Sequence, residues 1–237
     1  MNSIQQNIEH ITTQIHDSTQ KCGRARDSVQ LLAVSKTKPV EAILEAYHAG
    51  QRAFGENYVQ EGVEKVRFFA EQHPEKSIEW HFIGPIQSNK SRLVAEHFAW
   101  VHTIDRDKIA QRLNDQRPAE LPPLQVLIQV NTSGEASKSG VSGEEEIFAL
   151  AELISTLPNL TLRGLMSIPE NVDDHASQLA AFQPLAELQQ RLVQRYPSVD
   201  TLSMGMSGDM DAAIESGSTM VRIGTAIFGH RDYSNKA

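Results

Sequence analysis

Eight short apolar or β-branched runs recur along the chain, and most are followed by a polar turn and a helix-like stretch. Runs that are apolar on both faces are typical of parallel strands covered on both sides, and their alternation with helices is typical of strand–helix–strand units. Eight such units within 237 residues favour a closed barrel over an open doubly wound sheet. We therefore predict an α/β fold, a single (β/α)8 TIM barrel, with strands over 31–36, 52–57, 79–84, 100–105, 124–131, 161–168, 199–205 and 219–224.

An amphipathic helix precedes the first strand. Four isoleucines at helical spacing form one apolar stripe, and a glycine then ends the helix: Ile4, Ile8, Ile11, Ile15 and Gly23. We interpret residues 1–23 as a helix packed on the outside of the barrel, which we favour over a partner-binding arm. No linker or shift in composition divides the chain, and Pro122-Pro123 is typical of a loop. The whole of 1–237 is therefore expected to be one domain.

Composition narrows the possible partners and compartment. The chain carries 30 acidic and 22 basic side chains, a net charge of -8, without a basic cluster, which argues against nucleic acid and anionic membranes. We find neither a secretory leader nor an apolar run long enough to span a bilayer. Cys22 is the only cysteine, which suits a reducing compartment, and we expect it to be inert. These features predict a soluble cytoplasmic protein.

Lys36 is the most unusual residue at a strand end. It closes the apolar run LLAVSK, and alternation places it on the same side as Leu32 and Val34. A lysine there must either snorkel to solvent or lose solvent, and loss of solvent lowers the pKa of the amine toward its nucleophilic free base. Such an amine can form a Schiff base with a carbonyl compound. Both interpretations, a snorkelling lysine and a functional one, remain open from the spacing alone.

The last two strands indicate an anion site. Gly205 and Gly208 flank Ser207 before a helix-like stretch, and the final strand ends with Arg222, Gly224 and Thr225. Backbone N–H groups exposed at a glycine turn and a helix start bind anions, and barrels often hold a phosphate after strands seven and eight. The alternative is that the neighbouring acidic residues, Asp209 and Asp211, are ordinary residues of a first helical turn.

Several other chemistries lack their sequence patterns. Neither GxxxxGK[ST] nor a complete GxGxxG is present, so a nucleoside triphosphate or dinucleotide site is unsupported. The nine histidines show no HExxH spacing and there is no CxxC, so no metal site is predicted. A GxSxG nucleophile elbow is also missing. Asn57 and His81 are further polar residues at or beside predicted strand ends.

Six strings in order along the chain closely resemble the pyridoxal phosphate homeostasis protein family: AVSKTKP, FGENYVQE, WHFIGPIQSNK, RGLMSIP, LSMGMSGDM and VRIGTAIFG. They extend from about residue 31 to 229, nearly the whole chain. The resemblance implies a fold-type III barrel related to the N-terminal domain of alanine racemase, which binds pyridoxal 5'-phosphate (PLP) through a Schiff base on Lys36. It further implies a set of PLP contacts: Arg222 at the pyridine nitrogen, Ser207, Gly224 and Thr225 at the phosphate, Asn57 beside the ring, and His81, Met166 and Ser203 in the pocket wall.

Members of this family are regarded as carriers or regulators of PLP without established catalytic turnover. The resemblance therefore implies a non-enzymatic protein that buffers PLP or delivers it to PLP-dependent apo-enzymes, and we expect a monomer. Two enzymatic alternatives share the lysine: an amino-acid racemase and a class I aldolase-type barrel. A racemase needs a second acid–base group, which related racemases supply from a second domain, and the residues after the last strand are too few for one. Lys138, in a glycine- and serine-rich loop after strand five, is a candidate for transient PLP transfer.

Overall fold

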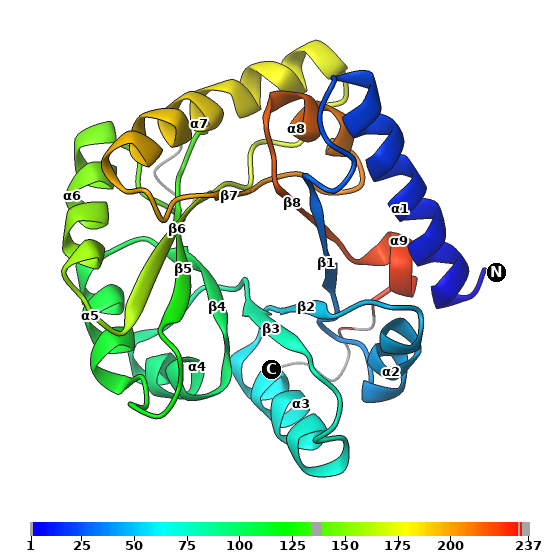
Figure 1. The fold of residues 1–237 in the computed structure, drawn as a ribbon, viewed down its shortest axis with the longest axis horizontal. Helices are drawn as coiled ribbons and strands as arrows, with labels where there is room; N and C mark the ends of the chain where they lie inside the picture. The colour runs from blue at the N-terminus through cyan, green and yellow to red at the C-terminus, as the bar shows by residue number, and fades with distance from the viewer. Residues whose placement is uncertain (1, 134–138, 232, 234–237) are drawn as a thin grey trace.

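The structure, a computed structural model, describes residues 2–133, 139–231 and Tyr233. Eight parallel strands form a closed barrel in the order β1 to β8, and β8 pairs with β1 to complete the ring (Figure 1). The predicted (β/α)8 barrel is therefore confirmed. The strands are β1 (Gln30–Val34), β2 (Ala53–Glu56), β3 (Glu79–Phe82), β4 (Trp100–Ile104), β5 (Leu124–Gln129), β6 (Leu160–Met166), β7 (Thr201–Ser203) and β8 (Met220–Ile223).

The strands are shorter than predicted, and the difference matters most at the first one. β1 ends at Val34, so Lys36 lies two residues beyond it and not within it. Ser35 N still donates to Gly55 O at 3.0 Å, but Thr37 then adopts a left-handed backbone conformation with φ of 66°. That turn cannot continue a strand, because an extended strand needs negative φ.

Helices surround the barrel and follow each strand (Figure 1). After the N-terminal helix α1 (Ile4–Lys21) they are α2 (Val40–His48), α3 (Val59–Gln72), the short 3-10 helix η1 (Ser88–Lys90) with α4 (Ser91–His97), α5 (Asp107–Gln116), α6 (Glu144–Ser155), α7 (His175–Arg195), α8 (Met210–Ser216) and α9 (Thr225–Phe228). None of the helices within the described residues is both long and apolar enough to cross a bilayer.

The N-terminal helix α1 lies against α8 and α9, at the other end of the sequence (Figure 1). Ser3 begins it with a capping box, and Ile8, Ile11 and Ile15 are buried on its inner face. Asn7 Nδ2 also donates to the carbonyl of Ile227 at 2.8 Å. The predicted stripe therefore packs on the outside of the barrel.

Apolar side chains fill two layers. The larger layer lies between strands and helices, where alternate strand residues such as Ala33, Phe54 and Val221 are buried. The residues between them point into the barrel and form two smaller clusters: Leu32, Ala53 and Met220 in one, Trp100, Leu127 and Met166 in the other. Because the interior is filled, the barrel is a packed core and not a pore.

Gly164 marks an irregularity in β6. The register between β5 and β6 shifts after Val126, and Gly164 adopts φ of 149° there. A Cβ at this position would lie 1.8 Å from the carbonyl oxygen of Thr201 on β7. Glycine is required because both the positive φ and the close backbone approach exclude a side chain.

Candidate functional site

A cavity of about 740 Å³ lies where the carboxyl ends of the strands meet. All eight strands, or the loops that follow them, contribute lining residues, and this end of a parallel barrel is where such folds place their chemistry. Apolar side chains including Val34, Ile83 and Ile168 share the wall with polar ones. Six residues selected from the sequence line this cavity: Lys36, Asn57, Ser207, Arg222, Gly224 and Thr225.

The other three candidates lie below the cavity. His81, Met166 and Ser203 have no exposed surface and are not among its lining residues. Met166 packs in the apolar cluster with Trp100, whereas His81 and Ser203 belong to a buried polar group in the barrel interior. The expected place of these three in the pocket wall is therefore not what the structure has. Lys138 lies outside the described residues.

The Lys36 amine is partly withdrawn from solvent. The residue is only partly exposed and its side chain lines the cavity. Burial lowers the pKa of this amine, and the positive charge of Arg231 lowers it further, while Tyr233 and Glu61 oppose the shift. A larger fraction of the nucleophilic free base follows at any given pH.

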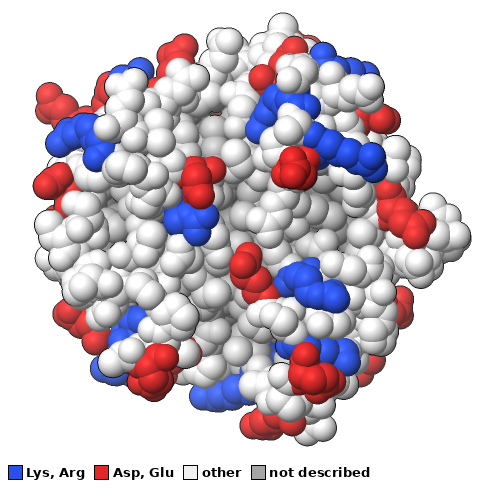
Figure 2. Space-filling view, in the orientation of Figure 1, with Lys and Arg blue, Asp and Glu red and all other residues white. Residues whose placement is uncertain are grey.

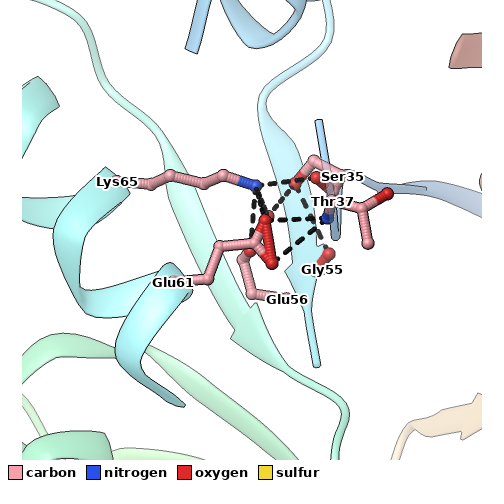
Figure 3. Close-up of polar contacts among 6 residues, drawn as sticks. All are labelled: Ser35, Thr37, Gly55, Glu56, Glu61 and Lys65. Atoms are coloured by element: carbon pink, nitrogen blue, oxygen red, sulfur yellow. Dashed lines mark hydrogen bonds and ion pairs between the residues drawn. The ribbon is translucent and has the colours of Figure 1, made fainter. Parts of the chain in front are cut away.

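A buried ion pair anchors the residue before Lys36 (Figure 3). Lys65 on α3 contacts Glu56 at the end of β2, with Nζ 3.0 Å from Oε2, and both side chains are almost fully buried. Lys65 Nζ also donates to the carbonyl of Ser35 at 2.8 Å, and the Ser35 hydroxyl donates to Glu56. Burial raises the pKa of Glu56, and the charge of Lys65 opposes that shift. Ser35 is thus held through both its carbonyl and its side chain.

The residue after Lys36 is anchored by the same helix. The backbone N–H of Thr37 donates to the Glu61 carboxylate, at 2.8 Å to Oε2 and 3.1 Å to Oε1. Glu61 in turn pairs with Lys65 one helical turn later, at 3.1 Å. Figure 3 shows the two carboxylates and the ammonium group converging on Ser35 and Thr37. We call Glu56, Glu61 and Lys65 the α3 clamp, because together they fix the backbone on both sides of Lys36.

Arg222 supplies a buried cation to the cavity. Its Nη1 donates to the hydroxyl of Ser203 at 2.7 Å and its Nη2 to the carbonyl of Ser167 at 2.9 Å, so both of these acceptors are neutral. Burial lowers the pKa of Arg222 to about 10, and the charge of Asp209 opposes the shift. The guanidinium therefore stays charged near neutral pH and can donate to a ligand atom but not transfer a proton to it.

The residues at the start of α9 and in the turn after β7 also line the cavity. Helix α9 begins after Gly224, and its first internal hydrogen bonds come from Ile227 and Phe228, so Thr225 and Ala226 have no acceptor within the helix. The exposed residues Ser207 and Gly208 lie in the turn after β7. In that turn Asp209 is the residue before α8, and its Oδ1 accepts from Met206 N at 2.7 Å. This arrangement suits an anionic group.

The charges around the site are mixed. On the face shown in Figure 2, acidic and basic side chains are interspersed and form no large patch of one sign. Across the described ranges, no group of three or more histidine, cysteine, aspartate or glutamate side chains could hold a metal ion. The cavity thus offers an amine, a buried guanidinium and amide donors to an organic anion.

Comparison with known proteins identifies the class first. Residues 3–232 match the family model described as alanine racemase, N-terminal domain. The alanine racemase of Bacillus anthracis shares the fold with a TM-score of 0.65 at 15% identity, over 94% of this chain and 56% of that one. This chain is therefore a barrel of the alanine racemase N-terminal type.

Two relatives of high similarity define the family. A Vibrio cholerae protein named pyridoxal phosphate homeostasis protein is 77% identical over 237 residues, with 100% of both chains covered. PipY of Synechococcus elongatus, solved with PLP bound, is 34% identical with a TM-score of 0.81, over 96% of this chain and 100% of that one. The chain belongs to the pyridoxal phosphate homeostasis protein family.

Proposed function

We propose that this chain binds PLP in the cavity, with the Lys36 amine joined to the aldehyde of PLP as a Schiff base. The observation that carries the proposal is the juxtaposition of a partly desolvated amine and a buried guanidinium in one cavity. When bound, PLP supplies an aldehyde and an electron-accepting ring. The relatives' names and the PLP-bound state of PipY support the same ligand.

The residues present fit this ligand. Arg222, Ser207, Gly224 and Thr225 line the same cavity. In the proposed complex Arg222 would donate to the pyridine nitrogen, and the other three would bind the phosphate through hydroxyl and amide donors. Asn57 also lines the cavity, and in the proposed complex it would contact the ring. Ser167, next to the cavity residue Ile168, has a buried hydroxyl without a partner among the described residues, which leaves a polar group available.

The protein acts in PLP homeostasis, as a carrier and not as an enzyme. Arg222 cannot protonate the pyridine nitrogen, and a neutral ring is a weaker electron sink than a pyridinium. The cavity therefore holds the cofactor more than it activates it.

We further propose that the protein works as a cytoplasmic monomer, that 1–237 form one domain, and that PLP-dependent apo-enzymes receive the cofactor.

A racemase remains the second candidate, because the same fold carries Lys36 in this cavity. One spectroscopic experiment separates the possibilities. Purified protein incubated with PLP is expected to be yellow, to change its visible spectrum when an amino acid is added, and to retain PLP covalently after borohydride reduction. Colourless protein with no reducible adduct would overturn the proposal, and would instead suit an aldolase-type lysine. Product analysis with amino acids then tests for racemisation.

A further inference from the structure

A row of hydrogen-bonded polar side chains crosses the barrel interior beneath the cavity. Glu79 Oε1 lies 2.7 Å from Nε2 of His81, and His81 Nδ1 lies 2.9 Å from Nε2 of His102. The other nitrogen of His102, Nδ1, is 3.0 Å from Oγ of Ser203, which also accepts from Nη1 of Arg222 at 2.7 Å. These contacts connect the first residue of β3 with the guanidinium in the cavity wall.

The two ends of this row determine which atom carries the hydrogen in each of its hydrogen bonds. A guanidinium can only donate, so Ser203 accepts from Arg222 and must direct its single hydrogen elsewhere. At the other end the Glu79 carboxylate can only accept, so His81 carries its proton on Nε2 and its Nδ1 accepts from Nε2 of His102. The bare Nδ1 of His102 then accepts the hydrogen of Ser203. All four hydrogen bonds therefore point from Arg222 towards Glu79.

Neutral imidazoles are required for this pattern, since a charged ring would have two donors and no acceptor. His81 and His102 are completely buried. Burial lowers the pKa of His81 despite the opposing effect of Glu79, and it lowers the pKa of His102 well below its usual value. The hydrogen bond with His81 is the main cause that lowers the pKa of Glu79, which keeps this carboxyl ionised. Neutral histidines and an ionised Glu79 are thus the charge states that this hydrogen-bond pattern requires.

We propose that Glu79, His81 and His102 form a directed hydrogen-bond relay that positions Arg222 for the ring of PLP through the Ser203 hydroxyl. The relay residues do not line the cavity, so they are positioning residues and not catalytic ones. This inference rests on the proposed function for its ligand but not for its hydrogen-bond pattern. Without an acceptor at Glu79, the imidazole tautomers lose their fixed end, and Ser203 no longer holds Nη1 in one place.

The first test uses the cofactor-free protein. In long-range proton–nitrogen spectra with sequence-specific assignment, we expect His81 and His102 to be neutral near pH 7, with hydrogen on Nε2 and a bare Nδ1. A hydrogen on Nδ1 of either ring, or a charged ring, would overturn the relay. This result does not depend on PLP, so it separates failure of the relay from failure of the proposed function.

The second test changes the end of the relay farthest from the cavity. Glu79 has 42% of its side chain exposed, and besides His81 its carboxylate is hydrogen-bonded to the side chains of Gln30 and Trp100. In Glu79→Ala we expect mixed tautomers at both histidines, shifted guanidinium resonances of Arg222, and PLP release about tenfold faster, equivalent to about 1.4 kcal/mol. Glu79→Gln keeps an acceptor oxygen and is expected to restore the tautomers and the release rate.

Glu75→Ala is the matched control, because Glu75 precedes β3, is exposed, and pairs only with the nearby side chains of Lys76 and His73 in the described structure. We expect it to leave the Arg222 resonances and PLP release unchanged. Unchanged Arg222 resonances and release in Glu79→Ala would overturn the positioning role. So would a Glu79→Gln variant as impaired as Glu79→Ala, because the role assigned to Glu79 is that of a hydrogen-bond acceptor.

Discussion

At the scale of single residues, the proposed attachment of PLP depends on one amine, whose burial lowers its pKa toward the nucleophilic free base. Lys36 lies beyond the end of β1, where its neighbours are held by other residues and its own side chain faces the cavity. Its attachment role can be tested separately from its contribution to the fold. A residue in a surface-connected cavity adds little packing, so truncation is expected to leave stability almost unchanged.

We expect Lys36→Ala to lose the yellow colour and the borohydride-reducible adduct while it keeps its melting temperature. Contacts to the phosphate and the ring still allow some PLP to bind as the free aldehyde. Mass spectrometry of the reduced protein and a thermal melt measure both effects. A stoichiometric reducible adduct in the variant would mean that another lysine is the attachment site.

The pH dependence of PLP attachment follows from the same amine. Burial lowers its pKa from the ordinary 10.5. Protonated amine does not attack an aldehyde, so the rate of attachment rises with pH through the pKa of Lys36 and then levels off. We expect the midpoint of this rise to lie below 10.5, as measured by stopped-flow absorbance. A midpoint at or above the ordinary lysine value would contradict the desolvated state of the amine.

At the scale of elements, helix α3 controls the loop that carries Lys36. The α3 clamp joins one helix to the turns after two strands, and it satisfies the backbone of Ser35 and Thr37 (Figure 3). The left-handed conformation of Thr37, uncommon for a β-branched residue, persists because the Glu61 carboxylate binds its N–H. The clamp thus connects stability with the geometry of the site.

Lys65→Met tests the clamp. Removal of the ammonium leaves the Glu56 carboxylate buried without its partner, which typically costs about 3–5 kcal/mol in the free energy of unfolding. We expect a loss of this size in urea denaturation, together with slower attachment of PLP to Lys36. Lys108→Met, at an exposed position on α5, is the control and should change stability by less than about 0.5 kcal/mol. Equal stability of the two variants would contradict a role for the clamp.

At the scale of the whole molecule, the barrel resembles racemases in fold, and the residues that line its cavity bear on whether it can racemise an amino acid. Its described lining residues include Lys36 and Asp209 but no tyrosine, histidine or cysteine, and Tyr233 influences the pKa of Lys36 without lining the cavity. Racemisation requires proton removal on one face and delivery on the other, and loss of one such group typically forfeits about 10²–10⁴-fold in rate.

We therefore expect PLP-loaded protein to interconvert L- and D-alanine negligibly. Chiral chromatography of the incubated amino acids measures this directly, with an authentic alanine racemase as the positive control. Slow exchange of the α-hydrogen in heavy water is compatible with the carrier function. Sustained inversion at typical enzyme turnover, about 1–10³ per second, would contradict it.

The barrel was predictable from sequence because eight alternating strands and helices can close into few folds. The cavity residues were predictable because the carboxyl ends of parallel strands converge at one end of the barrel. The depth of each side chain was not predictable in this way. His81 and Ser203 follow the same inward alternation as the cavity residues but are fully buried, and Ile83, two residues after His81, is the one that lines the cavity. The pairing of Glu56 with Lys65 depends on the rotation of α3 about its axis, which a strand-end pattern does not specify. A charged residue at the end of the apolar run RAFGEN was the one available indication of the clamp.

The contact of α1 with α8 and α9 has a consequence for biosynthesis. A ribosome makes α1 before the barrel that it covers, yet the surfaces that cover Ile8, Ile11 and Ile15 include α8 and α9. β1 likewise waits for β8 before the ring can close. An apolar stripe therefore remains uncovered until α8 and α9 have been made, and contacts so distant in sequence form slowly. The nascent chain is expected to need protection from aggregation, such as a chaperone bound to α1, until those two helices emerge.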